Sequence, residues 1–388
     1  RMDIRKLIRK QYLKFLDREP DLDDLDYYFD ELKNNNIRLD DLINILKNSD
    51  EFKELSKNPK IPQPPMSSVD TYNDIRIKGK TLSLGYRNSE KRYAEIFKFC
   101  KKFNRPISVL DLGAAEGYFT FRLAEDFPGV FVAVESNPER KLLELCKKNN
   151  DHKVLLLNKQ MNLKNLKNIK EVQHFDIVLA LNIIHHFDEP FQDVLEALIS
   201  MSSFCFLEHP NSLENESTKN SQRLKTEKLD LEKFKPILLN KNPSGLGNPL
   251  NQKLERNLWL LQNTQSKTID RGWRGASKYT EEFGPGNQII IKSNFDEINV
   301  NYGLRDEKRN WIQGIDLRTF LEYNGVYPTN ETIINLINNL KIENVKDLGP
   351  HNLILNGECL FLIDQDDKLD AVNTKEKLKE FLKQSGLL

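Results

Sequence analysis

Five short apolar runs, separated by helix-length stretches, constrain the fold of this chain more than any other feature. The runs occupy residues 108–112, 131–135, 153–158, 175–182 and 204–208. Short buried runs that alternate with amphipathic segments indicate parallel strands joined by crossover helices. We therefore predict an α/β fold built on a mostly parallel sheet.

The first run leads into a turn rich in small residues. Residues 108–120 read Ser-Val-Leu-Asp-Leu-Gly-Ala-Ala-Glu-Gly-Tyr-Phe-Thr. Because Gly113 and Gly117 lack Cβ atoms, a nucleoside-type ligand could approach the backbone closely at the end of this strand. A dinucleotide fingerprint needs Gly-x-Gly-x-x-Gly, and the third glycine of that pattern is missing here. The turn therefore disfavours NAD and FAD.

The second run, Phe131-Val-Ala-Val-Glu135, also ends in an acid. Glu135 follows the glycine turn by about 20 residues, the separation at which a carboxylate reaches a ribose hydroxyl in nucleotide-binding α/β folds. We expect Glu135 to accept both ribose hydroxyls.

The glycine turn resembles the first motif of the class I S-adenosylmethionine-dependent methyltransferases, acidic-x-Gly-x-Gly-x-Gly, with Ala115 in place of the second glycine. The fourth run continues into Ile183-Ile-His-His-Phe187, which resembles the fourth-strand motif of small-molecule and sugar methyltransferases. The resemblance implies a Rossmann-like domain with a mostly parallel seven-stranded sheet and S-adenosyl-L-methionine as cofactor. A Rossmann-like domain that binds another nucleotide is the alternative.

The same resemblance implies which residues hold the cofactor. They lie in the turn, after the second and third runs, and at the end of the fourth: Asp111, Gly113, Ala115, Gly117, Tyr118, Glu135, Asn158, Lys159, Gln160 and Asn182. Asn158, Lys159 and Gln160 are expected beside the adenine. Upstream of the first run, Tyr86 and Arg87 are candidates to cover the cofactor carboxylate.

Methylation of a hydroxyl group needs a base near the methyl group, and the loop after the fourth strand is where this fold places one. His185 and His186 are the candidates, and we expect His185 to face the pocket. Glu208 or His209 would serve as orienter or second base. As an alternative, His185, Glu208 and His209 could hold a divalent metal that assists the reaction.

The flanking regions predict further units, with boundaries at residues 1–57, 58–80, 81–293 and 294–388. The first predicts three helices. It resembles a small helical module that accompanies bacterial surface-layer proteins, glycosyltransferases and methyltransferases, which implies glycan-related work; docking or homo-oligomerisation is the alternative. A proline-rich linker follows, then the methyltransferase domain and an appended C-terminal α+β region.

Within the later part of the chain, residues 249–265 predict a helix and residues 288–292 a strand that completes the sheet. Between them, Arg271, Trp273 and Arg274 have a composition suited to binding a sugar face or an anion, although an ordinary surface turn would have the same residues.

Residues 353–364 predict a hairpin with Asn356-Gly357 at its turn. Together with the preceding residues 347–352, this segment also resembles the catalytic loop and metal-binding strand of kinase-like phosphotransferases. Asp347, Asn352 and Asp364 have the matching positions. A glycine-rich loop and a strand lysine are lacking. We therefore favour a degenerate kinase-like fragment or a simple β cap.

Composition limits the partners. Lysine plus arginine and aspartate plus glutamate both total 58, so the net charge is zero and gives no strong nucleic-acid signal. The four cysteines form no Cys-x-x-Cys pair, which predicts buried free thiols in a reducing compartment. No apolar run approaches the roughly 18 residues that a transmembrane helix needs. We predict a cytoplasmic protein.

These observations predict a methyltransferase that modifies a sugar hydroxyl in a surface glycan or its precursor, with a glycan or nucleotide sugar as substrate. An RNA or small-molecule methyltransferase is an alternative within the same class. A noncatalytic glycan-assembly scaffold with a vestigial cofactor pocket is the alternative from another class.

Overall fold

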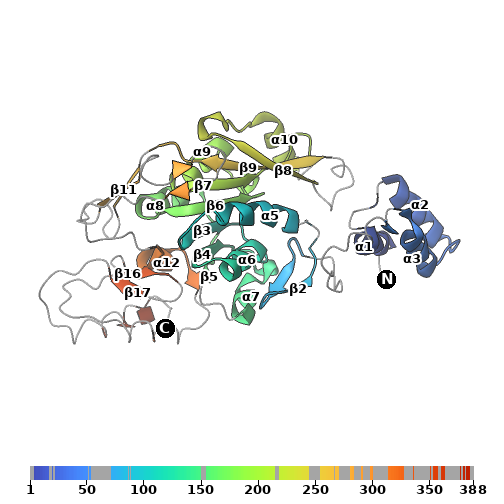
Figure 1. Cartoon of the computed structure of the whole chain (residues 1–388), viewed down its shortest axis with the longest axis horizontal. Helices are drawn as coiled ribbons and strands as arrows, with labels where there is room; N and C mark the ends of the chain where they lie inside the picture. The colour runs from blue at the N-terminus through green and yellow to red at the C-terminus, as the bar shows by residue number, and fades with distance from the viewer. Residues whose placement is uncertain are drawn as a thin grey trace, which may run out of the picture.

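A computed structural model gives the fold of the chain (Figure 1). It describes residues 4–16, 20, 22–50, 52–53, 71–85, 87, 89–149, 154–214, 218–243, 254–265, 267–270, 280–283, 290–291, 298–299, 313–326, 335, 350, 353–356, 360–362, 376, 379–380 and 382–384.

The central sheet has the strand order β15-β5-β4-β3-β6-β7-β9-β8. Its five parallel strands are β3 (Ile107–Leu112), β4 (Gly129–Val134), β5 (Val154–Leu157), β6 (Phe175–Leu181) and β7 (Ser202–Glu208). Three antiparallel strands extend its edges: β8 (Ile237–Pro243), β9 (Glu255–Gln262) and β15 (Gly325–Val326). The α/β fold with a mostly parallel sheet is confirmed, but the sheet has eight strands where seven were expected.

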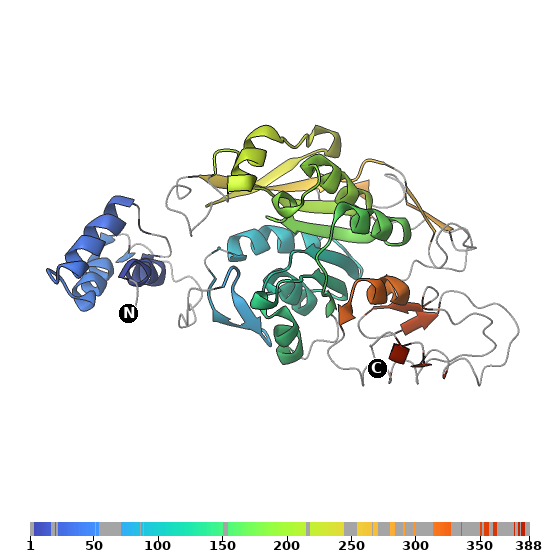
Figure 2. The ribbon, with the colours of Figure 1, turned by 180° about the vertical axis from the view of Figure 1, so that it is seen from behind.

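Helices cover both faces of this sheet, as Figures 1 and 2 show. One face packs against α5 (Ser89–Cys100), α6 (Tyr118–Asp126) and α7 (Leu142–Asn149). The other packs against α8 (Leu163–Val172), α9 (Phe191–Ser200) and α12 (Leu317–Glu322). Strand residues alternate between the two cores, so that Val109 faces the first and Leu110 the second. This arrangement leaves the carboxyl ends of the parallel strands as the common edge for a ligand.

The N-terminal helices are α1 (Ile4–Leu16), α2 (Leu22–Lys33) and α3 (Leu39–Asn48). Three helices were predicted here, and their apolar faces meet in a core of their own around Ile8, Leu25 and Leu42. None of the described helices is long and apolar enough to cross a membrane.

A hairpin follows, formed by β1 (Ile75–Ile77), in the range predicted as linker, and β2 (Lys80–Ser83), which begins at the last residue of that range. Ile75 and Ile77 pack against the core on the α5–α7 face, and Arg76 pairs with Glu125 of α6 at 2.7 Å. The hairpin is therefore part of the central domain's packing. The proline-rich residues 58–65 lie outside the described residues.

Two predictions for the later part of the chain are wrong. Residues 255–262 form strand β9 rather than a helix, because their apolar side chains alternate between faces: Leu258 and Leu260 enter one core, Trp259 and Leu261 the other. The described part of the run at 288–292 lies outside the central sheet. This part, β12 (Ile290–Ile291), pairs with β13 (Ile298–Asn299) in a separate two-stranded sheet.

The other short elements are β10 (Lys267–Asp270), paired with β11 (Thr280–Phe283), the helix α10 (Thr218–Thr226), and the 3-10 helices η1 (Pro138–Arg140), η2 (Ile184–His186) and η3 (Glu232–Phe234). Cys100, Cys146 and Cys205 are buried free thiols, as predicted, and Cys359 lies outside the described residues.

The C-terminal region packs on the central domain. The predicted hairpin pairs β16 (Leu353–Leu355) with β17 (Leu360–Leu362), and β14 (Ile315–Asp316) adds a third strand. Ile315, Phe320 and Leu353 are fully buried in the core on the α8–α9 face. Gly357 and the kinase-like residues Asp347, Asn352 and Asp364 lie outside the described residues.

Candidate functional site

The glycine turn between β3 and α6 has the left-handed backbone that its sequence suggests. Gly113, Ala115 and Gly117 have φ angles of 72°, 50° and 75°. A Cβ atom on Gly113 would lie 2.6 Å from Cδ1 of Ile183, in the loop after β6. Glycine at position 113 therefore allows the histidine-bearing loop to pack against this turn.

Glu135 lies at the end of β4, beside the same turn. Its carboxylate accepts the main-chain N–H of Ala115 at 3.0 Å, of Ser136 at 2.9 Å and of Asn137 at 2.8 Å. The side chain is half-buried, so its oxygens stay within reach of a ligand in the edge. All of the described hydrogen bonds to this carboxylate come from main-chain N–H groups.

Two residues that flank the turn, Asp111 in β3 and Tyr118 in α6, are buried. Asp111 is 2% exposed and accepts the Thr120 hydroxyl at 2.6 Å, and its burial raises the pKa to about 6 despite that hydrogen bond. Tyr118 is 1% exposed, packs against Tyr93 and donates its hydroxyl hydrogen to Glu90 at 2.6 Å. Asp111 thereby links β3 to α6, and Tyr118 links α6 to α5.

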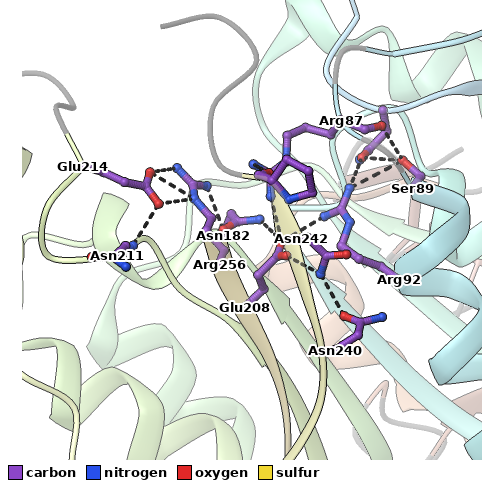
Figure 3. A network of polar contacts seen from close by, with 12 residues as sticks. Arg87, Ser89, Arg92, Asn182, Glu208, Asn211, Glu214, Asn240, Asn242 and Arg256 are labelled. Atoms are coloured by element: carbon purple, nitrogen blue, oxygen red, sulfur yellow. Dashed lines mark hydrogen bonds and ion pairs between the residues drawn. The ribbon is translucent and has the colours of Figure 1, made fainter. Parts of the chain in front are cut away.

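Glu208, at the end of β7, lies at the centre of a buried polar network (Figure 3). Its carboxylate accepts from Arg87 at 3.0 Å, Arg92 at 3.2 Å and Asn242 at 2.9 Å, and also from the Asn182 amide. Burial raises the pKa of Glu208, but Arg92 and Arg87 lower it further, so the carboxyl stays ionised. A carboxylate held by two guanidinium groups is poorly suited to take up a proton.

The network continues through Asn182, which has a φ of 64° at the end of β6. Its side-chain oxygen accepts from Arg256 of β9 at 2.8 Å. Arg256 in turn pairs with buried Glu214 at 2.8 Å, and Glu214 accepts the main-chain N–H of Asn211. The hydrogen bonds of Asn182 link the ends of β6, β7 and β9, as the sticks in Figure 3 show.

The two histidines after β6 differ in exposure. His185 is 3% exposed, and its ring centroid lies 4.0 Å from that of His186 and 5.9 Å from that of His209. Burial, followed by the neighbouring His186 and His209, lowers the pKa of His185 well below its usual value. His186 is exposed, and burial of part of its ring together with Arg256 lowers its pKa. Both rings are therefore neutral near pH 7.

His185 and His209 share a further property, because the Nδ1 atom of each is buried and makes no hydrogen bond in the described part of the chain. Burial lowers the pKa of His209 to about 4. Within the described residues, no group of three histidine, cysteine, aspartate or glutamate side chains could hold a metal ion. The ligand set His185, Glu208 and His209 is therefore not assembled, since arginine and amide donors occupy Glu208.

The residues expected beside the adenine follow β5 at the adjoining edge. Asn158 and Gln160 are exposed and Lys159 is half-buried. The N–H of Asn158 donates to the carbonyl of Asn324 at 3.2 Å. Tyr86 and the predicted substrate-binding residues Arg271, Trp273 and Arg274 lie outside the described residues.

Sequence reasoning missed Glu116, which lies inside the glycine turn. It accepts the N–H groups of Tyr72 and Asn73 at 3.0 and 2.8 Å and pairs with Arg140 at 3.2 Å. Glu116 thereby holds the segment before β1 against the turn. The position of Glu116 within the motif could have pointed to it. No local sequence pattern points to Arg92, Asn242 or Arg256.

A cavity of about 760 Å³ lies apart from these strand ends, between β9 and the segment that leads into β8. Trp259, Leu231, Glu232 and Lys235 are among its lining residues, and none of the predicted site residues reaches it. We place the candidate site at the strand ends, where the buried and perturbed ionisable groups converge.

Comparison with protein families matches residues 104–256 to a methyltransferase domain and residues 3–56 to a domain of unknown function. A search of curated proteins by sequence gave no match.

Three similar solved structures cover different shares of the chain. The bifunctional kinase-methyltransferase WbdD is 16% identical, with 77% of this chain and 81% of that chain covered and a TM-score of 0.38. The N-terminal domain of EvdMO1, in the presence of SAH and D-fucose, is 15% identical, with 50% of this chain and 91% of that chain covered and a TM-score of 0.34. The plantazolicin methyltransferase BpumL, in complex with a pentazolic desmethylPZN analog and SAH, is 17% identical, with 45% of this chain and 87% of that chain covered and a TM-score of 0.29.

Proposed function

We propose that this chain, whose residues 104–256 match a methyltransferase domain, uses S-adenosylmethionine to methylate a hydroxyl group of a sugar in a surface glycan or its precursor. The observation that carries the proposal is the neutral, enclosed His185, which lies two residues after Ile183, the residue that packs against the glycine turn. A neutral imidazole has one ring nitrogen with a free lone pair, so it can accept the proton that a hydroxyl group loses.

The residues at the edge fit the proposed cofactor. The turn at the end of β3 has a left-handed backbone at Gly113, Ala115 and Gly117, of which Gly113 is half-buried, and the Glu135 carboxylate lies one strand away. On binding, Glu135 would exchange main-chain donors for the two ribose hydroxyls. S-adenosylmethionine supplies the activated methyl group, and the protein aligns and desolvates the reactants.

Asp111 fits the same cofactor through charge. Burial raises its pKa to about 6 although the Thr120 hydroxyl donates to it, so a nearby cation would favour its ionised form. We assign Asp111 to the positively charged part of the cofactor, next to the turn.

For the acceptor side we assign two different roles. His185 takes the hydroxyl proton as the new oxygen–carbon bond forms. Glu208 is a positioning residue, because it fixes Asn182 and, through Asn182, Arg256 around the loop that carries His185. His186, exposed and nearer the cofactor side, packs its ring on His185.

Labelled methyl transfer tests the proposal, with extracted glycans, nucleotide sugars and RNA offered as acceptors. We expect label in the glycan or nucleotide-sugar fraction, and His185→Ala should abolish turnover while S-adenosylhomocysteine (SAH) still binds. His186→Ala is the matched control and should retain most turnover. Salt-sensitive labelling of RNA would favour the RNA alternative. Binding of SAH without any transfer would favour the noncatalytic scaffold.

A further inference from the structure

We infer that Asn324, in the turn between α12 and β15, is a positioning residue that fixes the nucleobase end of the cofactor site. The inference rests on the proposed function. Asn324 belongs to the region that the sequence predicted to be an appended unit, so it gives that region a part in cofactor binding.

The first step is a hydrogen-bonded chain across three strand ends. The N–H of Glu135, after β4, donates to the carbonyl of Leu157 in β5 at 3.2 Å. The N–H of Asn158 then donates to the carbonyl of Asn324 at 3.2 Å, and the Asn324 amide donates back to the Asn158 carbonyl at 3.4 Å. Asn324 is thus the last residue in a chain of contacts that begins at Glu135, the residue proposed to bind the ribose.

The second step is the direction of the cofactor. The glycine turn follows β3, Glu135 follows β4, and β5 is the next strand in the sheet. If the ribose lies at Glu135 and the amino-acid part at the turn, the base continues toward the end of β5. Asn158 is the first residue beyond that strand, and its main chain is the part that Asn324 holds.

The third step is the conformation of Asn324 itself. Its φ of 53° lies in the left-handed region, which asparagine and glycine tolerate and β-branched residues avoid. The next residue, Gly325, lies so close to Phe320 that a Cβ atom there would approach the ring to 2.4 Å. This turn is therefore pressed against α12 and has little freedom to move while α12 stays packed.

The fourth step is the anchoring of the turn in the core. Phe320 and Tyr323 are almost fully buried, and Asp316 caps α12 by accepting the Thr319 N–H at 2.8 Å. The Lys159 ammonium group lies 5.6 Å from the centre of the Tyr323 ring. Two consecutive residues of the turn, Tyr323 and Asn324, thus contact two consecutive residues after β5.

Calorimetric titration with SAH tests this inference on the full chain. Asn324→Val forces a β-branched residue into the left-handed region, which such residues avoid. If the turn shifts to relieve that strain, SAH affinity should fall by about tenfold, corresponding to ~1.4 kcal/mol. Asn324→Gly keeps the backbone conformation and should bind within about threefold of the natural chain.

The matched control is Asn35→Val. Asn35 also has a left-handed backbone, with a φ of 58°, but it lies in the turn between α2 and α3. It should lose local stability and leave SAH affinity unchanged. Amide hydrogen exchange provides a second measurement: the Asn158 amide should exchange faster in Asn324→Val, and SAH should protect it in the natural chain.

Equal SAH affinity of the natural chain and a folded Asn324→Val variant would overturn the inference. If that variant does not fold, the milder Asn324→Ala decides in its place, and unchanged affinity would have the same meaning. Failure of the natural chain to bind SAH would instead remove the proposed function, so the two failures are distinguishable.

Discussion

Glu135 and Glu208 have the same position in the sequence pattern, since each ends an apolar strand of the central sheet, yet the structure surrounds them differently. Glu135 is half-buried, and its described donors are main-chain N–H groups. Glu208 is 1% exposed and lies between two arginine side chains and two amides. Similar local sequence therefore produces a carboxylate open to a ligand at β4 and a buried ion-pair centre at β7.

The difference follows from what packs over each strand end. Above β7, α5 supplies Arg92 and the segment before it supplies Arg87, while the edge strand β8 supplies Asn242. Beside β4, the described donors to Glu135 are main-chain N–H groups, one of which comes from the glycine turn. We propose that the end that stays open binds the ligand and that the filled end stabilises the domain.

Removing the buried carboxylate should give the largest effect. Glu208→Ala leaves Arg87 and Arg92 buried without their shared counter-ion, which costs about 3–5 kcal/mol of unfolding free energy. Urea denaturation measures this loss. Glu135→Ala is the matched control and should cost less than about 1 kcal/mol. Similar losses for the two variants would contradict the contrast between the two strand ends.

Changing the open carboxylate should affect ligand binding instead. Glu135→Gln removes the charge that strengthens two hydrogen bonds to the ribose, so SAH should bind about 10- to 100-fold more weakly, as expected for ~1.5–3 kcal/mol. Calorimetry measures the affinity. Glu139→Gln, four residues later and exposed, should bind SAH normally. Unchanged affinity in Glu135→Gln would remove this residue from the site.

The histidines at the β6 and β7 ends should make stability depend on pH. The pKa of His209 is about 4 in the folded chain, below the value of 6.5 in the unfolded chain, because the ring is buried. The contribution of neutral His209 to the free energy of unfolding is fully present above pH 6.5. It is lost as the pH falls toward 4, since the unfolded chain binds the proton first.

Between pH 7 and pH 5, His209→Gln should lose about 1–2 kcal/mol less unfolding free energy than the natural chain, allowing for partial exposure of the ring. Urea midpoints at pH 7 and pH 5 provide the measurement. Identical pH dependence in the variant and the natural chain would show that His209 is not held neutral by its surroundings.

The smallest effect is expected for the helical module. Its described apolar side chains form a separate core around Ile8, Leu25 and Leu42. A chain that begins at residue 54 should therefore bind SAH with unchanged affinity. A loss of affinity beyond about threefold would mean that the module contributes to the strand-end site.

The sequence predicted those parts of the fold that local pattern determines. The five parallel strands have short apolar runs with polar ends, and the glycine turn needs the left-handed angles found at Gly113 and Gly117. Strand β9 escaped prediction, because Leu254, Leu258 and Leu261 match a helical spacing while burial in the structure follows a period of two.

The site was predictable in part for the same reason. Glu135 and the histidine loop follow predicted strands, so their meeting at one edge follows from parallel topology. The partners of Glu208 come from residues 87, 92, 182 and 242, and such distant pairings leave no local pattern. The two-residue strand β15 is too short to be recognised, although it carries the turn that borders Asn158.

A crystal structure of the full chain with bound SAH would test the central claim most directly. The account predicts the ribose hydroxyls on the Glu135 carboxylate, the amino-acid part at the turn of residues 113–117, and Glu208 still paired with Arg87 and Arg92. A nucleoside bound elsewhere, with Glu135 still holding the N–H groups of Ala115, Ser136 and Asn137, would contradict it.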